Sequence, residues 1–231
     1  MKICGLIPAY NEEGTAVGVI KDTLKYVDKV IFVNDGSQDK TLDVVKSNLS
    51  NDKRIKILSW DRNQGKGYAL IQGFKKFLGS DCSILVTLDA DGQHDPSQIP
   101  YMIAPLRNKS SDVVLGVRMP NPEYSKPRVF FNIVSSLAVL LAAGSFHTDV
   151  ASGFKAYTKY AVKKILPHLK TKDFSIELEI LKAQSMESLR SASIPISTMV
   201  GKKATFWKLA RAYTNFAWKY RKDILKRVFR I

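Results

Sequence analysis

Two aspartates one residue apart, Asp89 and Asp91, have the spacing in this chain that points most directly to chemistry. They follow a run of apolar residues that is too hydrophobic to hold them in its interior, so both are expected on the loop behind it. Two close carboxylates repel each other unless a cation lies between them. With Gln93 they form an oxygen-rich set that suits Mg²⁺ or Mn²⁺, ions that commonly join a few protein oxygens to substrate phosphates. The spacing predicts a metal–diphosphate site, with His94 beside it as a loop residue rather than a ligand.

A second group of residues suits a nucleoside. Tyr10 offers an aromatic face for a base, and the carboxylates of Glu12 and Asp35 can accept hydrogen bonds from ribose hydroxyls or base amino groups. Lys66 lies in a glycine-rich loop that opens a predicted helix, a place that favours anions, although the loop lacks the spacing of a P-loop. Each of these clusters could also be a turn followed by a helix cap, because Asn, Asp, Ser and Gly favour both.

The elements that must position these residues are short strands and helices in alternation. Five apolar runs rich in β-branched residues predict strands at 2–7, 29–33, 54–58, 83–88 and 112–117. Strands this apolar, alternating with segments of helical period, are typical of an α/β protein whose mainly parallel sheet carries helices on both faces. Ligands bind such sheets beyond the carboxyl ends of the strands. The polar clusters follow the first, second and fourth predicted strands, so we expect them on one rim.

Four motifs in one order make the chain similar to a known family. They are Pro-Ala-Tyr-Asn-Glu-Glu at 8–13, Asn-Asp-Gly-Ser-Gln-Asp-Lys-Thr at 34–41, Asn-Gln-Gly-Lys-Gly at 63–67 and Asp-Ala-Asp-Gly-Gln-His-Asp-Pro at 89–96. In this order they resemble the family 2 glycosyltransferases of GT-A fold, specifically the dolichyl-phosphate mannose synthase and polyprenyl-phosphate glycosyltransferase branch. Further similarity at 116–118, 149–155 and 174–179 extends the match over roughly the first 200 residues.

The resemblance implies a fold and a set of site residues. Residues 1–201 would form the GT-A domain, a Rossmann-like, mainly parallel sheet with helices on both faces, and 202–231 a tail of basic amphipathic helices. A nucleotide-sugar donor would be bound by Pro8, Tyr10, Glu12, Val33, Asp35, Lys66, Asp89, Ala90, Lys202 and Lys203. The metal would be held by Asp89, Asp91 and Gln93. The residues expected to take part in catalysis are Asp91, Arg118, Arg128 and Asp149.

The reaction that the resemblance implies is displacement at the anomeric carbon with inversion, while the metal and cations stabilise the departing nucleoside diphosphate. Arg118 and Arg128 would neutralise phosphate, either on the donor or on a phosphorylated lipid acceptor. A phosphate acceptor is already ionised near neutral pH and needs positioning rather than a strong base. A hydroxyl acceptor would need a base, with Asp149 the first candidate and Glu177 the second. Asp149 could equally be a buried residue that fixes the turn after it.

Composition and charge limit the class of protein. The chain has 231 residues, 45% of them apolar, and a formal net charge of +15 from 36 Lys and Arg against 21 Asp and Glu. These proportions exclude collagen-like, low-complexity and disordered proteins. The excess charge implies an anionic partner such as nucleic acid, phosphates or lipid. Residues 202–231 hold ten basic residues and one acid, a net charge of +9 that leaves +6 for the preceding residues.

The basic tail has a helical pattern. Apolar residues recur at steps of three or four, and cations recur at similar steps on the other side. The apolar stripe is Phe206, Leu209, Tyr213, Phe216, Tyr220, Ile224 and Val228. Trp207 and Trp218 fall near the boundary between the two faces, as in helices that lie in a membrane interface. We therefore predict an interfacial tail. In the alternative interpretation, the stripe packs on the body and the basic face is merely solvated.

Three further features bear on location. Residues 129–148 form the longest charge-free stretch, but the stretch carries polar residues and lies between two family motifs, so we expect helices beside the acceptor site rather than a membrane span. The apolar residues before Pro8 are too few for a signal peptide. Cys4 and Cys82 lie in separate apolar runs and are expected as buried thiols rather than a disulfide, which favours a reducing, cytoplasmic setting.

The sequence thus predicts a cytoplasmic enzyme bound peripherally to a membrane. It would transfer a hexose, mannose or glucose, from a donor of the GDP-mannose or UDP-glucose type to a polyprenyl or dolichyl phosphate, with Mg²⁺ or Mn²⁺ as cofactor. A soluble glycosyltransferase acting on a glycan or protein hydroxyl is an alternative. A basic nucleic-acid-binding module, from another class of protein, would explain the tail and leave the strand-end carboxylates without a role.

Overall fold

The computed structural model describes residues 1–119, 133–134, 136–137, 139–141, 144, 147, 149–198, 206–222 and 224–225, without the side chains of 206–210, 212 and 213. Three predicted site residues, Arg128, Lys202 and Lys203, lie outside the described residues, as does most of the charge-free stretch. Within the described part of that stretch, 133–134, 136–137 and 139–141 are helical. No helix among the described residues is both long enough and apolar enough to cross a membrane.

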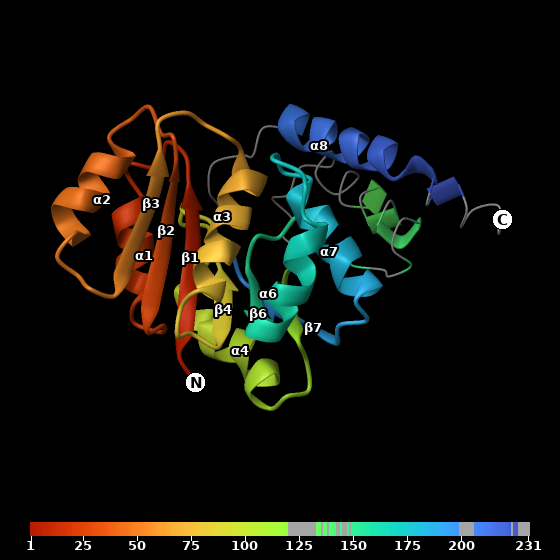
Figure 1. Cartoon of the computed structure of the whole chain (residues 1–231), viewed down its shortest axis with the longest axis horizontal. Helices are drawn as coiled ribbons and strands as arrows, with labels where there is room; N and C mark the ends of the chain where they lie inside the picture. The colour runs from red at the N-terminus through yellow and green to blue at the C-terminus, as the bar shows by residue number, and fades with distance from the viewer. Residues whose placement is uncertain are drawn as a thin grey trace.

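A seven-stranded sheet forms the centre of the molecule, with the strand order β3-β2-β1-β4-β6-β5-β7 (Figure 1). The strands are β1 (Ile3–Ala9), β2 (Lys29–Asp35), β3 (Ile55–Trp60), β4 (Ile84–Thr87), β5 (Val113–Arg118), β6 (Lys155–Thr158) and β7 (Ser191–Ile196). The first five confirm the predicted strands. All paired strands are parallel except β6, which lies antiparallel between β4 and β5.

Helices cover both faces of the sheet, as predicted. They are α1 (Ala16–Thr23), α2 (Thr41–Leu49), α3 (Lys66–Leu78), α4 (Ile99–Arg107), α6 (Lys159–Ile165), α7 (Ile176–Met186) and α8 (Phe206–Lys219), with short 3₁₀ turns at Pro96–Gln98 and Leu166–His168. Because side chains alternate along a strand, β1 sends Leu6 into one buried cluster with α3, α6 and α7, and Ile7 into another with α1, α2 and α4. Burial on both sides explains why the central strands β1 and β4 are rich in apolar residues.

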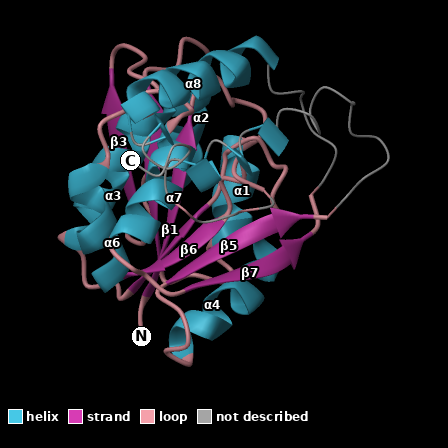
Figure 2. Cartoon of the chain, turned by 90° about the vertical axis from the view of Figure 1, so that its right-hand side faces the viewer, coloured by secondary structure: helices cyan, strands magenta, loops and turns pink. Residues whose placement is uncertain are grey.

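The strands β6 and β7 have no counterpart among the predicted strands. Strand β6 has only four residues and begins with Lys155, a charged residue that is nonetheless fully buried. Strand β7 contains Pro195, which a sheet tolerates at an edge, and it is the outer strand next to β5 (Figure 2). The antiparallel direction of β6 matters for the site, because it brings the start of this strand to the edge where the parallel strands end.

The tail helix packs on the body of the protein. Phe216 of α8 is buried in the cluster that contains α7, and the partly buried Tyr220 and Ile224 pack against the same cluster. These residues are four apart and therefore share one face of the helix. For these members of the predicted apolar stripe, the structure agrees with the alternative interpretation, in which the stripe packs on the body.

The expectation of two separate thiols is wrong, because Cys4 and Cys82 form a disulfide with their Cα atoms 5.9 Å apart. The strands β1 and β4 are neighbours, with Ile3 paired with Ile84, so Cys4 near the start of β1 meets Cys82 just before β4. The two apolar runs are 78 residues apart in the chain, and their sequences alone do not show that they pair. The cysteines therefore give no support to a reducing compartment.

Candidate active site

The loops that follow the strands gather at one edge of the sheet. The loop after β1 is tied to the loop after β2 because the backbone N–H of Asn11 donates to Ser37 Oγ at 3.0 Å and the N–H of Gln38 donates to Asn11 Oδ1 at 2.8 Å. The N–H of Glu12 donates to Thr41 Oγ1 at 2.7 Å. The predicted convergence of the polar clusters on one rim is confirmed for these loops.

The acidic motif follows β4. Asp91 accepts hydrogen bonds from the side chain and the backbone of Gln93, at 2.6 and 3.0 Å. His94 is buried, with its Nε2 3.4 Å from Asp89 Oδ2. Burial opposes ionisation of Asp89, but Lys66 and the hydrogen bond from His94 outweigh it and hold its pKa well below the usual range. Burial, and then the negative charge of Asp89, raise the pKa of Asp91. Asp89 therefore has a cation beside it and a lowered pKa, whereas Asp91 has the negative charge of Asp89 beside it and a raised pKa.

A chain of buried charges connects this motif to α7. Lys66 Nζ lies 2.7 Å from Asp89 Oδ1 and 3.1 Å from Glu177 Oε1. The other oxygen of Glu177 accepts a hydrogen bond from Lys155, whose ammonium also donates to the carbonyl of Ser152. Burial lowers the pKa of Lys66, but Asp89 and Glu177 outweigh this effect and raise it. We call Asp89, Asp91, Lys66, Glu177 and Lys155 the acidic rim.

Glycines leave the space that this arrangement needs. A Cβ atom on Gly153 would lie 2.5 Å from Asp89 Oδ2, so a side chain at this position would displace the carboxylate. Gly65 has φ +99°, a conformation that favours glycine. Next to it, the N–H of Gly67 donates to the carbonyl of Lys172 at 2.8 Å, so the start of α3 lies against the segment that precedes α7.

The oxygen atoms of the acidic motif after β4 fit a divalent cation shared with a substrate. Asp89, Asp91 and Gln93 supply carboxylate and amide oxygens, which Mg²⁺ and Mn²⁺ prefer. Burial and the negative charge of Asp89 raise the pKa of Asp91, and a divalent cation between the two carboxylates would relieve their repulsion. In the part of the chain that the structure describes, no group of three or more His, Cys, Asp and Glu side chains could hold a metal by itself. A pair of carboxylates completed by substrate phosphates does not need such a group.

On the nucleoside side, the carboxylate of Asp35 supports the loop that carries Lys66. It accepts hydrogen bonds from the backbone N–H of Gln64 at 2.9 Å, from that of Gly65 at 2.8 Å and from Trp60 Nε1 at 2.6 Å. Trp60 has no motif around it, and the sequence analysis missed it. The role of Asp35 in base recognition stays a prediction.

The other predicted donor residues lie around this loop or beside the acidic motif. Tyr10 is exposed and Pro8 half-buried at the end of β1. Val33 and Ala90 are buried among core side chains, so only their backbone atoms could face a donor. Glu12 accepts a hydrogen bond from Thr15 Oγ1 at 3.0 Å. These contacts leave the predicted roles untested.

Arg118 and Asp149 form a bidentate pair at the end of β5. Arg118 Nη2 lies 2.6 Å from Asp149 Oδ1, and Arg118 Nε donates to Oδ2 at 2.7 Å. The backbone N–H of Arg118 also donates to Oδ2, at 3.1 Å. Asp149 is buried, and although burial opposes its ionisation, the contacts with Arg118 lower its pKa. Both oxygens of Asp149 are thus committed to holding Arg118.

Comparison with known proteins identifies the family. Residues 5–166 match the model of the family "Glycosyl transferase family 2". The match covers more than half of the chain. The chain belongs to this family. It is an enzyme, and the alternative of a basic nucleic-acid-binding module is wrong.

Curated relatives confirm the resemblance to the polyprenyl-phosphate branch. The chain is 32% identical over 211 residues to a UDP-N-acetylglucosamine–dolichyl-phosphate N-acetylglucosaminyltransferase of Methanococcus voltae, covering 84% of each chain. It is 27% identical over 205 residues to an undecaprenyl-phosphate mannosyltransferase of Micrococcus luteus, covering 85% of this chain and 83% of the relative.

A solved structure confirms the GT-A fold. Glucosyl-3-phosphoglycerate synthase from Mycobacterium tuberculosis, crystallised with Mn²⁺, UDP and glucosyl-3-phosphoglycerate, superposes with a TM-score of 0.74. The superposition covers 96% of this chain and 80% of the other at 17% sequence identity, so it supports the fold alone.

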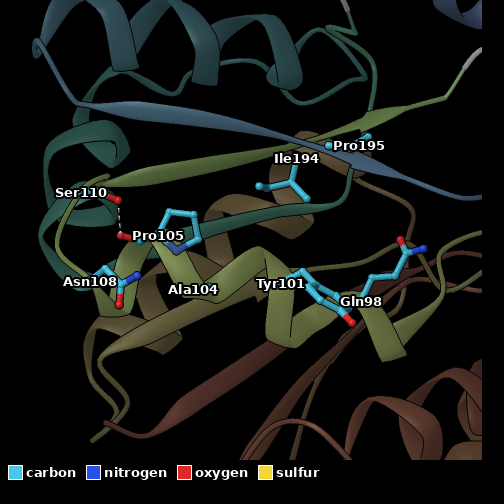
Figure 3. A pocket seen from close by; sticks show the side chains of 8 residues that line it. All are labelled: Gln98, Tyr101, Ala104, Pro105, Asn108, Ser110, Ile194 and Pro195. Atoms are coloured by element: carbon cyan, nitrogen blue, oxygen red, sulfur yellow. Dashed lines mark hydrogen bonds between the residues drawn. The ribbon is translucent and has the colours of Figure 1, made fainter.

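A groove of about 610 Å³ between α4 and β7 contains none of the predicted site residues (Figure 3). Tyr101 and Gln98 lie toward one end, and Asn108 and Ser110 toward the other. Ser110 Oγ donates to the carbonyl of Pro105 at 3.1 Å. This groove is separate from the acidic rim in its residues, and we assign it no role.

Proposed function

We propose that the enzyme transfers a hexose, with inversion, from a nucleoside-diphosphate sugar to a polyprenyl or dolichyl phosphate at a membrane surface. The observation that carries the proposal is that Asp149 and Glu177, the two carboxylates considered as a base, are both paired with cations. A phosphate acceptor is ionised near neutral pH and requires no base. The names of the relatives from Methanococcus voltae and Micrococcus luteus, both enzymes of lipid phosphates, support this acceptor class.

The metal would be Mg²⁺ or Mn²⁺, held by Asp89, Asp91 and Gln93. When bound, it would compensate negative charge on the diphosphate leaving group. The solved relatives crystallised with Mn²⁺ include the Mycobacterium tuberculosis synthase and a mannosyltransferase of Pyrobaculum calidifontis with GDP-mannose. Their donors carry different bases, so they leave open whether this enzyme uses a UDP- or a GDP-sugar.

The chain's own residues would position and neutralise phosphates. Lys66 presents its ammonium between Asp89 and Glu177, where it can neutralise charge that develops on the leaving group. Arg118 is held rigidly by Asp149, which makes it a pre-organised cation for a phosphate oxygen. In this proposal Asp149 is a positioning residue and not a base.

Transfer to a glycan or protein hydroxyl, the alternative acceptor class, would require a carboxylate able to accept a proton. Asp149 is bidentate with Arg118, and the oxygens of Glu177 contact Lys66 and Lys155. Burial of Asp149 is outweighed by its contacts with Arg118, which lower its pKa and make it a weak base, while Glu177 is held between two cations. This pairing favours the phosphate acceptor.

The cytoplasmic face of the membrane stays a prediction. A lipid acceptor requires this enzyme to meet a bilayer surface. The basic tail is our candidate for that contact.

The proposal is tested by incubating the purified enzyme with UDP- and GDP-hexoses, a polyprenyl phosphate and Mn²⁺, and measuring the glycolipid formed. We expect transfer with at least one donor, loss of transfer in a chelator, and recovery when metal is restored. Asp91→Ala should lower transfer at least about 100-fold without lowering the melting temperature, because the residue lies on a rim loop. Full activity in chelator would refute the metal site, and efficient transfer to a free sugar hydroxyl alone would refute the acceptor.

A further inference from the structure

Among the described side chains of the tail, Phe216, Lys219 and Tyr220 contact the body of the protein. Tyr220 OH donates to Glu179 Oε1 at 3.0 Å, and Lys219 pairs with the same oxygen. Lys182 Nζ lies 4.4 Å from the centre of the Tyr220 ring. The centres of the Phe216 and Tyr220 rings lie 4.8 Å apart. We call Glu179 and Lys182, both on α7, the tail seat. The predicted apolar stripe is therefore unavailable to a lipid surface at these positions.

The opposite side of α8 and of the helical residues that follow it, 221–222 and 224–225, carries a second surface. Arg211, Trp218, Lys222 and Leu225 follow one another at steps of seven, four and three residues, which places them on one helical face, away from Phe216 and Tyr220. Trp218 is 71% exposed and Leu225 is 52% exposed. Figure 1 shows α8 along the outer edge of the molecule, consistent with a face that looks away from the body.

This outer face combines cations with large apolar side chains. Arg211, Arg221 and Lys222 are exposed, and the Arg221 guanidinium lies 4.5 Å from the centre of the Trp218 ring. A tryptophan beside cations suits the boundary between lipid headgroups and acyl chains, because the ring is apolar with one polar edge. The cations are attracted to anionic headgroups.

We propose that this outer face, made of Arg211, Trp218, Arg221, Lys222 and Leu225, docks the enzyme on an anionic phospholipid bilayer. The inference rests on the proposed function, because a lipid acceptor is what requires the enzyme to meet a membrane. It differs from the sequence-based expectation in the surface used. The apolar stripe anchors the helix to the body, and the residues opposite the stripe meet the lipid.

The tail seat also connects the helix that carries the outer face to the loop that carries Lys66. Glu179 Oε2 accepts hydrogen bonds from the backbone N–H of Lys170 at 2.8 Å and of Thr171 at 2.9 Å. The next residue, Lys172, accepts the hydrogen bond from Gly67 beside Lys66. When the outer face is bound to a membrane, these contacts would hold the acidic rim in a fixed orientation relative to the bilayer.

The test is sedimentation of the full chain with phosphatidylcholine vesicles that contain or lack phosphatidylglycerol. Two double variants change the outer face: Trp218→Ala with Leu225→Ala removes its apolar side chains, and Arg221→Glu with Lys222→Glu reverses two charges. The matched control, Lys21→Glu with Lys46→Glu, makes the same charge change at exposed positions of α1 and α2. Melting temperatures of all variants show whether the fold is retained.

We expect the natural chain to sediment with anionic vesicles, and high salt to weaken this binding. Both outer-face variants should bind at least about tenfold more weakly, while the control binds within about twofold of the natural chain. Equal loss in the control would overturn the proposal, since net charge alone would then explain binding. Sedimentation with duplex DNA but not with anionic vesicles would overturn it as well.

Transfer to a short-chain polyprenyl phosphate that dissolves in water separates this inference from the proposed function. If the outer-face variants retain that transfer but lose vesicle binding and transfer to vesicle-borne acceptor, the proposal holds. If the natural chain transfers to the soluble acceptor without binding vesicles, the docking face is wrong and the function stands. If vesicle binding depends on the outer face but no lipid phosphate is glycosylated, the function is wrong and the docking face stands.

Discussion

Helix α7 carries two buried glutamates that serve different regions. Glu177 belongs to the acidic rim, where its two oxygens contact the side-chain cations of Lys66 and Lys155. Glu179 belongs to the tail seat and is fixed by two backbone N–H groups as well as by Lys219 and Tyr220. Side-chain ion pairs can be redistributed when a metal or phosphate binds, whereas backbone contacts hold a structure in place. We therefore expect changes in the acidic rim to affect sugar transfer, and changes in the tail seat to affect the position of the tail helix.

Among substitutions that disturb the acidic rim without changing its charge, we expect Gly153→Ala to reduce sugar transfer the most. The added Cβ would lie 2.5 Å from Asp89 Oδ2, and the carboxylate must move. Because a displacement of about 1 Å in an active site can cost about 100-fold in rate, we expect a loss of that size in the transfer assay.

The matched control for this substitution is Gly18→Ala, which places a Cβ where nothing lies within 4 Å, on an exposed turn of α1. It should leave transfer unchanged and raise stability by about 0.5–1 kcal/mol, because alanine favours a helix more than glycine does. Equal activity in both variants would show that the position of Asp89 does not matter.

The next effect compares the two glutamates directly. In Glu177→Gln, Lys66 loses one of its two carboxylates and is left to Asp89, where it competes with a metal. We expect the Mn²⁺ concentration for half-maximal transfer to rise about tenfold, the size seen when residues that support metal ligands are changed. Lys155 would lose its carboxylate while buried, so we also expect about 3 kcal/mol of destabilisation in denaturant unfolding.

Glu179→Gln is the control for Glu177→Gln, because it makes the same chemical change two residues along the same helix. It should leave the Mn²⁺ requirement unchanged. A rise in both variants would mean that α7, rather than the Lys66 contact, sets the metal requirement.

The sequence predicted the strands β1 to β5 well, because most of them are buried and rich in β-branched and other apolar residues. It also predicted Asp89, Asp91 and Gln93 together, since a strand end forces neighbouring polar residues onto one loop. It could not supply partners that lie far apart in the chain. Lys155 within a short strand gives no signal that Glu177 will meet it, and Cys4 gives no sign of Cys82 until β1 and β4 are paired.

The tail shows the same limit in another form. A stripe of Phe216, Tyr220 and Ile224 has the period of a helix that covers an apolar surface, but the period does not say whether that surface is lipid or protein. Residues of α7 determine that the surface is protein, because Glu179 and Lys182 contact Tyr220. A pattern within one element cannot reveal the partner that another element provides.

The smallest expected effect is on the seat itself, in Glu179→Gln. The variant keeps an oxygen for the backbone N–H groups but loses the charge that Lys219 contacts at a partly exposed position, so we expect about 1 kcal/mol less stability in the docked tail. Hydrogen exchange of α8 measures this loss. Burial opposes ionisation of Glu179, but Lys219 and the loop N–H groups outweigh it and lower its pKa.

A carboxyl with a lowered pKa in the folded state stabilises that state at any pH above the ordinary glutamate pKa of about 4.3, and the stabilisation is lost as the pH falls through the lowered value. Exchange protection of α8 in the natural chain should therefore fall below about pH 4, and Glu179→Gln should remove that component of the pH dependence. If the natural chain and the variant lose protection in parallel as the pH falls, the charge of Glu179 does not hold the tail on its seat.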